Sequence, residues 1–286
     1  MPQIIELPRA LFAATEQYRA AGQRVGLVPT MGALHEGHMS LVAAVRAAGA
    51  TRVVLSIFVN PLQFGQNEDL AKYPRTFAED LLRCERHGVD LVYAPQREGM
   101  YPGGFQSHVE VERVTLPFEG AARPTHFRGV TTVVCKLFNA TGPCVAAFGR
   151  KDYQQWRTIQ RMVDDLDLSV DVLGCPIARE SDGLAMSSRN RYLNEDQRGR
   201  AAAIHRGLQA ASRAFAAGLR ERAELERLAR APIEAAFDAI DYVAVADAED
   251  LTREGPTCGD SSVLLVAARL GSTRLIDNCR LGEECL

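Results

Sequence analysis

The chain has 286 residues, of which 47% are hydrophobic and 24% charged, and its formal net charge at pH 7 is −3. This length predicts one large domain with a smaller one appended, and no apolar run approaches the roughly 20 residues that cross a bilayer. The composition therefore favours a globular protein outside the membrane, and the lack of a basic block favours small molecules over nucleic acid as partners.

The start of the chain, Met1 to Gly22, contains acidic side chains and lacks the long apolar core of a signal peptide. The seven cysteines form an odd set without a CxxC pair, and most lie in apolar stretches. Both features predict a cytoplasmic protein with buried, reduced thiols.

The first two thirds of the chain alternate apolar, β-rich runs with helical patterns, which is typical of βαβ units around a parallel sheet. The predicted strands are Val25 to Val28, Val53 to Val59, Val89 to Tyr93, Cys144 to Phe148 and Val170 to Leu173. The predicted helices are Gly37 to Ala48, Thr76 to His87, Val130 to Asn139 and Tyr153 to Leu166. Strands with few polar alternations suit a sheet that is covered on both faces.

The pattern changes after about Pro176, and we predict two domains, residues 1–177 and 178–286. A polar loop leads to Asn194, with Gln197 three positions on, as in a capping box. Two helical stretches and three strand-like runs then predict a small α+β domain with an antiparallel sheet. These stretches are Gln197 to Ala217, Glu221 to Phe237, Tyr242 to Ala248, Ser262 to Leu270 and Thr273 to Asp277.

The segment Pro29 to Leu41 carries the strongest local signal, because it follows the first predicted strand and opens a helix. A helix start offers unpaired N–H groups and a positive dipole end, which suit an anion such as phosphate. His35 and His38 fall on one side of the first turn and can stabilise the charge that develops in nucleotidyl transfer. Two unrelated histidines capping a turn, or a zinc pair lacking a third ligand, are the alternatives.

Two further segments follow predicted strands and reach the same edge of the sheet. Asn60 and Gln63 can hold a carboxylate and a hydroxyl, although Asn-Pro turn chemistry explains these residues equally well. Lys151 can bridge phosphates, Asp152 can accept from ribose hydroxyls, and Gln155 lies one helical turn beyond Lys151. A solvated Lys-Asp helix start is the alternative for that second segment.

A fourth segment, Ala185 to Asn190, lies near the predicted domain junction. Its Ser187, Ser188 and Arg189 can close over a triphosphate, or the segment can be an ordinary polar linker. Neither a GxxxxGK[ST] loop nor a GxGxxG turn occurs in the chain, which disfavours a kinase-type loop and a dinucleotide site.

In this order and near these spacings, the motifs TMGALHEGH, SIFVNPLQF, YPRT, THFRGV, FGRKDYQQ and DGLAMSSRNRYL resemble the pantothenate synthetase family, which belongs to the HxGH nucleotidyltransferases. The resemblance spans nearly the whole chain. It implies a Rossmann-like N-terminal domain, a smaller C-terminal domain that acts as a lid, a homodimer, and Mg-dependent use of ATP. The implied activity condenses pantoate with β-alanine through a pantoyl-adenylate, releasing AMP and pyrophosphate.

The resemblance also implies roles for matching residues. His38 would be the favoured proton donor, with His35 and Lys151 on the phosphates. Gln63 and Gln155 would hold pantoate, with Asn60 nearby. The implied nucleotide contacts are Met31, Gly32, His35, Gly37, His38, Gly149, Lys151, Asp152, Ala178, Met186, Ser187, Ser188 and Arg189.

The resemblance assigns Asp80 to Mg or its waters, and a solvated helix acid is the alternative. It places Glu119, Arg123 and Arg128 near the site without fixing their roles.

Two positions depart from the family pattern: Arg150 stands where Glu is usual, and Trp156 where a smaller aliphatic residue is common. The AMSSR motif also lacks both lysines of the related KMSKS signature, so Lys151 would supply the phosphate ammonium. Two other functions remain open from the sequence: another adenylate-forming enzyme of the same superfamily, and a catalytically silent nucleotide-binding module.

Overall fold

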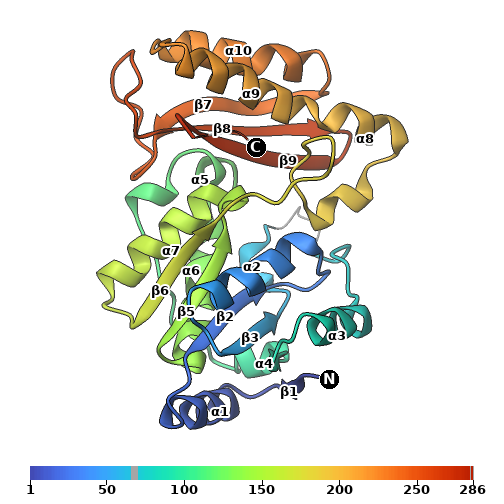
Figure 1. Ribbon diagram of the computed structural model, residues 1–286, viewed down its shortest axis with the longest axis vertical. Coiled ribbons are helices and arrows are strands. Elements are labelled where there is room, and N and C mark those ends of the chain that lie inside the picture. The colour runs from blue at the N-terminus through green and yellow to red at the C-terminus, as the bar shows by residue number, and fades with distance from the viewer. Residues whose placement is uncertain (66–69, 284, 286) are drawn as a thin grey trace. The chain divides into compact units, whose positions relative to one another are not determined.

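Two units, each with its own sheet and core, make up the chain in this computed structural model, which describes residues 1–65, 70–283 and 285 (Figure 1). The first unit consists of residues 1–149 and 155–176, and the second of residues 150–154 and 177–286. The division falls inside the first turn of helix α7 (Tyr153–Asp165).

A parallel sheet with the strand order β1-β4-β3-β2-β5-β6 lies at the centre of the first unit. Its strands are β1 (Gln3–Ile5), β2 (Val25–Thr30), β3 (Arg52–Ile57), β4 (Leu91–Tyr93), β5 (Cys144–Gly149) and β6 (Val170–Cys175). The chain runs outward from β2 through β3 and β4, and later occupies the other side of β2 with β5 and β6. Ligands of such sheets bind beyond the carboxyl ends of the strands at this switch point.

The helices of the first unit are α1 (Pro8–Ala20), α2 (Glu36–Ala47), α3 (Phe77–Arg86), α4 (Arg97–Met100), α5 (Glu119–Ala122), α6 (His126–Thr141) and most of α7. Two short 3-10 turns, η1 (Pro61–Gln63) and η2 (Arg113–Thr115), join them. Gly142, with φ of 70°, ends α6 in the left-handed region that favours glycine.

Both faces of this sheet are buried. Val53, Val54 and Leu55 of β3 are all fully buried, although successive side chains of a strand point to opposite faces. On one face, Val42 and Val45 of α2 join the apolar core, while α1 and α6 pack on one another and on β2. Coverage on both sides explains why the strand sequences have few polar alternations.

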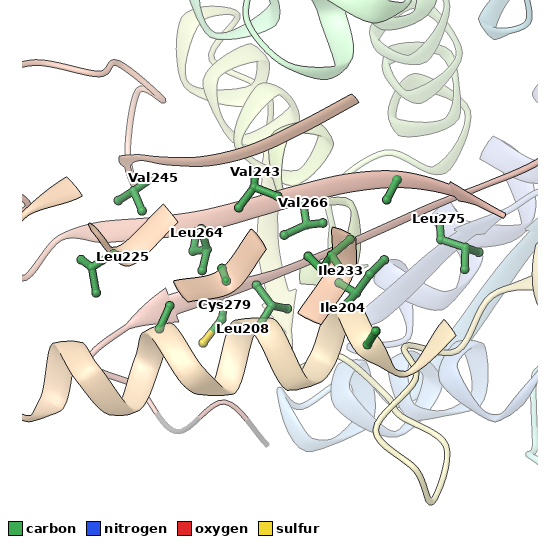
Figure 2. Packing of buried hydrophobic residues seen from close by; sticks show 14 of the residues in the cluster. Ile204, Leu208, Leu225, Ile233, Val243, Val245, Leu264, Val266, Leu275 and Cys279 are labelled. Atoms are coloured by element: carbon green, nitrogen blue, oxygen red, sulfur yellow. The ribbon is translucent and has the colours of Figure 1, made fainter. Parts of the chain in front are cut away.

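The second unit packs two helices on an antiparallel sheet of order β7-β8-β9 (Figure 2). Its elements are η3 (Arg150–Asp152), η4 (Ser188–Tyr192), α8 (Glu195–Ala201), α9 (Ala203–Ala216), α10 (Arg222–Glu234), β7 (Ala239–Asp247), β8 (Ser262–Leu270) and β9 (Thr273–Leu281). Leu208 of α9, Leu225 and Ile233 of α10, and Leu264 of β8 are fully buried in its core. The amphipathic helices and the alternating strands thus cover one another.

The expected fold class, a parallel α/β sheet with a smaller α+β unit, is confirmed. The capping box of Asn194 and Gln197 is also present at the start of α8. The single helix expected over 197–217 is instead divided into α8 and α9. Ala202 lies between the two helices, and its ψ is −7°. Within the described residues, no helix has both the length and the apolar character that a membrane span requires.

Close packing of α6 on η1 yields a prediction. A Cβ added at Gly129 would lie 2.3 Å from the main-chain oxygen of Leu62, so Gly129→Ala must displace backbone. We expect the variant to lose about 1–3 kcal/mol of unfolding free energy, as overpacked cores do. Guanidinium unfolding followed by circular dichroism measures the loss.

The matched control is Gly199→Ala, in helix α8, because a Cβ there meets no atom within 4 Å. This variant should be neutral or slightly stabilised, since Ala favours helix over Gly. Equal stability of the two variants would contradict the close approach at Gly129.

Candidate active site

Helix α2 begins directly after the β2 strand, and two histidines cap it. His35 is the N-cap residue, and its Nδ1 accepts a hydrogen bond from the Gly37 N–H at 3.2 Å. His38 Nδ1 in turn accepts from the His35 N–H at 3.3 Å. The histidines therefore form a capping box in which imidazoles take the place of the usual hydroxyl and carboxylate.

This capping box determines the tautomer of both rings. A ring nitrogen that accepts a hydrogen bond carries no proton, so each neutral imidazole carries its proton on Nε2. The ring centroids are 4.1 Å apart, and the side chains lie on the same side of the first turn, as their spacing predicts. Paired Nε2–H donors at a helix N-terminus are suited to phosphate oxygens.

The main-chain N–H groups of the turn that precedes α2 have acceptors inside the protein. Gly32 N–H donates to Thr30 Oγ1 at 3.1 Å. Ala33 and Leu34 donate to the two carboxylate oxygens of Asp80, at 3.0 and 2.8 Å. The turn before the helix therefore uses these three N–H groups for its own structure.

Asp80 lies beneath this turn and is 2% exposed. It also accepts from Thr76 Oγ1 at 3.2 Å. Ala33 has φ of 50°, a conformation that costs on the order of 1–3 kcal/mol for a residue with a side chain. The hydrogen bonds to Asp80 offset this strain and hold the turn.

A buried carboxylate with these partners does not fit direct coordination of Mg²⁺, which takes carboxylate oxygens together with several waters. Within residues 1–65, 70–283 and 285, no cluster of three or more His, Cys, Asp or Glu residues is arranged to hold a metal ion. The metal role that the resemblance assigns to Asp80 is therefore not supported by its contacts.

Asn60 supports the turn after β3. It is 1% exposed, and its Nδ2 donates to the carbonyl of Gly129 and to Gln63 Oε1, both at 3.0 Å. Its Oδ1 accepts from the Leu62 N–H at 3.3 Å and from the Tyr101 hydroxyl at 2.8 Å. Because all its polar atoms have protein partners, Asn60 shapes the surroundings of Gln63.

Gln63 joins the ends of β2 and β3. Its Nε2 contacts the sulfur of Met31 at 3.2 Å. Its main-chain carbonyl accepts from His126 Nδ1 at 2.9 Å and from Arg123 Nη2 at 3.2 Å. Since His126 donates from Nδ1, its neutral ring accepts the Arg123 N–H on Nε2, 3.2 Å away, and has the opposite tautomer to His35 and His38.

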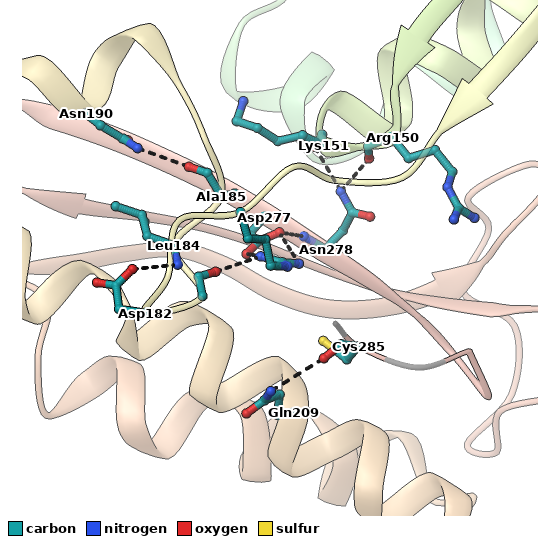
Figure 3. A network of polar contacts seen from close by, with 12 residues as sticks. Arg150, Lys151, Asp182, Leu184, Ala185, Asn190, Gln209, Asp277, Asn278 and Cys285 are labelled. Carbon is teal, nitrogen blue, oxygen red and sulfur yellow. Dashed lines mark hydrogen bonds and ion pairs between the residues drawn. The ribbon is translucent and has the colours of Figure 1, made fainter. Parts of the chain in front are cut away.

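In the second unit, β9 holds the turn that contains Lys151 (Figure 3). Asn278 Nδ2 donates to the carbonyls of Arg150 and Lys151, at 2.8 and 2.9 Å. The Lys151 ammonium lies 3.3 Å from Asp152 Oδ2, and Arg150 pairs with Glu283 at 3.0 Å. The Lys151 side chain thus extends from an anchored backbone.

The AMSSR segment lies on a short hairpin of the same unit. Met186 N–H donates to the Ala178 carbonyl at 2.9 Å, and Asn190 Nδ2 donates to the Ala185 carbonyl at 3.1 Å (Figure 3). Ser187 caps η4 by accepting from the Arg189 N–H at 3.2 Å. These contacts bring Ala178 beside Met186, with Ser188 and Arg189 following in η4.

The candidate residues fall into two groups. The first unit holds Met31, Gly32, His35, Gly37, His38, Asn60, Gln63, Asp80, Gly149 and Gln155, and the second holds Lys151, Asp152, Ala178, Met186, Ser187, Ser188 and Arg189. Contacts within the first unit connect Met31, Gln63 and Asn60, while Gln155 is half-buried near the start of α7.

Sequence reasoning did not identify four supporting residues: Thr76, Tyr101, His126 and Asn278. Thr76 and His126 lie within quoted motifs, YPRT and THFRGV, but their partners are distant in the sequence. Burial raises the pKa of the Tyr101 hydroxyl, in keeping with its role as a neutral donor to Asn60.

Comparison with protein families gives a match to the model described as pantoate-beta-alanine ligase over residues 3–280. Two curated relatives are pantothenate synthetases. That of Geobacter sulfurreducens is 48% identical over 283 residues, covering 99% of each chain. That of Sphingopyxis alaskensis is 50% identical over 280 residues, covering 98% of this chain and 100% of the relative.

Solved structures give the same result. The pantothenate synthetase from Thermus thermophilus matches with a TM-score of 0.92 and 42% identity, covering 98% of this chain and 99% of that one. The pantoate-beta-alanine ligase from Francisella tularensis, complexed with beta-gamma ATP and beta-alanine, matches with a TM-score of 0.81 and 29% identity over 100% of both chains.

The thiol of Cys84, buried in α3, gives a prediction about pH. Burial, with a smaller contribution from the charge of Asp80, raises the pKa of Cys84 from 9.0 to about 12. Because the unfolded chain loses this proton first, the contribution to stability is complete below about pH 9 and declines as the pH rises towards 12. As the pH rises, the unfolding free energy of Cys84→Ala should therefore fall less steeply than that of wild type. The two slopes should differ by at most about 1.4 kcal/mol per pH unit.

Guanidinium unfolding of both proteins at several pH values from 8 to 11, in the presence of a reductant, measures the two slopes. Other groups that titrate in this range are common to both proteins and cancel in the difference. Parallel slopes would show that the buried thiol has no such pKa.

Proposed function

Because the chain belongs to the pantoate-beta-alanine ligase family, we infer that it is a ligase that condenses pantoate with β-alanine in an ATP-dependent reaction. A carboxylate resists attack by an amine because its leaving group would be oxide. The reaction therefore passes through pantoyl-adenylate, and AMP and pyrophosphate are released.

The observation that carries the proposed site is the pair of Nε2–H imidazoles at the start of α2. Their Nδ1 atoms accept main-chain N–H groups at 3.2 and 3.3 Å, so both rings are preorganised as neutral donors. Donors that are fixed before the reaction stabilise developing phosphate charge without reorganisation. His35 and His38 are therefore proposed to bind the ATP phosphates, with Met31, Gly32 and Gly37 shaping the turn around the nucleotide.

In the first step, a carboxylate oxygen of pantoate attacks the α-phosphorus of ATP. The bond from that phosphorus to the bridging oxygen of the β-phosphate breaks, and pyrophosphate leaves with the electron pair. The Lys151 ammonium is proposed to neutralise phosphate charge as a compact cation, with Asp152 on the ribose. The proposed nucleotide contacts are completed by Gly149, Ala178, Met186, Ser187, Ser188 and Arg189.

In the second step, the neutral amine of β-alanine attacks the carbonyl carbon of the adenylate. The bond from that carbon to the AMP oxygen breaks, and the nitrogen gives up a proton. Water would destroy the mixed anhydride, so we propose that the C-terminal domain predicted over residues 178–286 acts as a lid during the reaction.

Pantoate is proposed to bind through the side-chain amides of Gln63 and Gln155. An amide can donate to a carboxylate and accept from a hydroxyl at the same time, which matches the two functional groups of pantoate. The hydrogen bonds from His126 and Arg123 to the Gln63 carbonyl, and that from Asn60 to its side chain, support this role because they fix the residue from both ends.

Magnesium is proposed to reach the site on the oxygens of ATP and its own waters, as it commonly does in nucleotide sites. The contacts of Asp80 do not favour a protein ligand there, and no step above depends on one. We further propose that the chain acts as a homodimer in the cytoplasm. Light scattering coupled to gel filtration tests the dimer.

An assay for AMP, with pantoate, β-alanine and ATP each omitted in turn, tests the reaction. We expect AMP only when all three are present, and pantoate-dependent exchange of pyrophosphate into ATP without β-alanine. Exchange with a different acid would indicate another adenylate-forming enzyme. Tight ATP binding without AMP would indicate a silent nucleotide-binding module.

Removal of one phosphate donor should strongly reduce turnover. We expect His38→Ala and Lys151→Ala each to lower kcat by roughly two orders of magnitude, as loss of a transition-state donor does. His87→Ala and Lys136→Ala are the matched controls, since both residues lie outside the proposed site. Near-wild-type exchange of pyrophosphate by the first two variants would refute their roles.

Removal of the pantoate amide should have a different kinetic signature. Gln63→Ala should raise the KM for pantoate about tenfold, which corresponds to about 1.4 kcal/mol of lost hydrogen bonding. The KM for ATP should stay within about twofold in the same variant, because the amide is not a proposed nucleotide contact. Initial rates at varied pantoate and varied ATP give both constants, and an unchanged pantoate KM would exclude Gln63 from that subsite.

A further inference from the structure

The carboxylate of Asp80 connects helix α3 with the turn that precedes the two histidines. Its Oδ2 accepts the Ala33 N–H at 3.0 Å and its Oδ1 the Leu34 N–H at 2.8 Å. Leu34 is followed directly by His35, the N-cap of α2. Asp80 therefore holds the residue directly before the first histidine.

The turn depends on this support because its backbone is unusual. Gly32 and Ala33 both have positive φ, at 83° and 50°. A Cβ at Gly32 would lie 3.1 Å from Asp80 Oδ2, so backbone and carboxylate are closely packed. A residue such as Ala33 stays in the left-handed region only where surrounding contacts hold it there.

Asp80 is itself held in place. Its main-chain N–H donates to the Thr76 carbonyl at 2.9 Å, and the Thr76 hydroxyl donates to Oδ1 at 3.2 Å. The carboxylate also lies near the N-terminal ends of both α2 and α3, where the helix dipoles favour a negative charge. The side chain is 2% exposed, so solvent competes little for these hydrogen bonds.

We propose that Asp80 is a positioning residue for adenylation: it holds the turn from Gly32 to Leu34 so that the capping box forms and both histidines keep their Nε2–H tautomer. This inference rests on the proposed role of His35 and His38 at the ATP phosphates. It gives Asp80 a function other than binding Mg²⁺, and the two roles differ in how activity responds to the metal.

The principal variant is Asp80→Asn, which preserves the shape of the side chain. One of its two polar atoms becomes an NH₂ donor, which must face the N–H of Ala33 or of Leu34. We expect kcat for pantoate-dependent exchange of pyrophosphate into ATP to fall at least tenfold. The Mg²⁺ concentration that gives half-maximal rate should stay within about twofold of wild type, and the KM for pantoate should change little.

Glu85→Gln is the matched control, because it makes the same carboxylate-to-amide change on α3 at an exposed position. It should behave as wild type in both measurements. Recovery of the Asp80→Asn rate by added Mg²⁺ would show that Asp80 is a metal ligand, and a wild-type kcat would show that it does not position the turn.

A second readout does not require turnover. Nitrogen-15 NMR of histidine-labelled protein distinguishes Nδ1–H from Nε2–H imidazoles. Wild type should show the Nε2–H form for His35 and His38 and the Nδ1–H form for His126, which serves as an internal reference. In Asp80→Asn the first two signals should change while that of His126 persists, and unchanged signals for all three would overturn the proposal.

Thr76→Val provides a milder test in case Asp80→Asn folds poorly by circular dichroism. It removes only the hydroxyl that supports Oδ1, and kcat should fall about two- to fivefold at an unchanged Mg²⁺ requirement; no fall in kcat would count against the proposal. If wild type itself shows no pantoate-dependent exchange, the proposed function fails. The NMR comparison would still decide whether Asp80 positions the histidines.

Discussion

Hydrogen bonds that the main-chain N–H groups of the turn after β2 donate to side chains determine the shape of the candidate active site. The N–H groups of Gly32, Ala33, Leu34 and His35 donate to Thr30, to the two oxygens of Asp80 and to His38. The turn uses these N–H groups for its own structure, and the two imidazoles that follow are the donors proposed for the ATP phosphates.

Side chains also hold the main chain at the two other candidate turns, which contain Gln63 and Lys151. The carbonyl of Gln63 accepts from Arg123 and His126, and Asn278 donates to the carbonyls of Arg150 and Lys151. In each case a side chain from a distant segment fixes main-chain groups at or next to a residue that is proposed to take part in the reaction. A reactive side chain keeps its geometry only if its own backbone is held in this way.

Local sequence patterns were sufficient to predict the parallel sheet, the smaller α+β unit and the histidine pair. Hydrophobic periodicity and the His35–His38 spacing depend on neighbouring residues. The sheet order confirms the fold class, and the ring contact confirms that both imidazoles lie on one side of the first turn, while their role in the reaction stays a prediction. The break at Ala202 could not be predicted, because alanine gives no stop signal in a helical stretch. The hydrogen bonds of Asp80 and His126 could not be predicted either, since their partners lie 46 and 63 positions away.

The tautomers also limit the chemical roles that His35 and His38 can have in the proposed reaction. A ring whose Nδ1 accepts a main-chain N–H and whose Nε2 carries the proton has no basic nitrogen available while the capping box is intact. Adenylation needs no base, because the pantoate carboxylate is already ionised near neutral pH and pyrophosphate leaves as an anion. Both imidazoles can therefore act as hydrogen-bond donors throughout the first step. Their proposed effect is to lower the energy of the charge that accumulates on phosphorus-bound oxygens, and the proton that β-alanine loses in the second step need not pass through either ring.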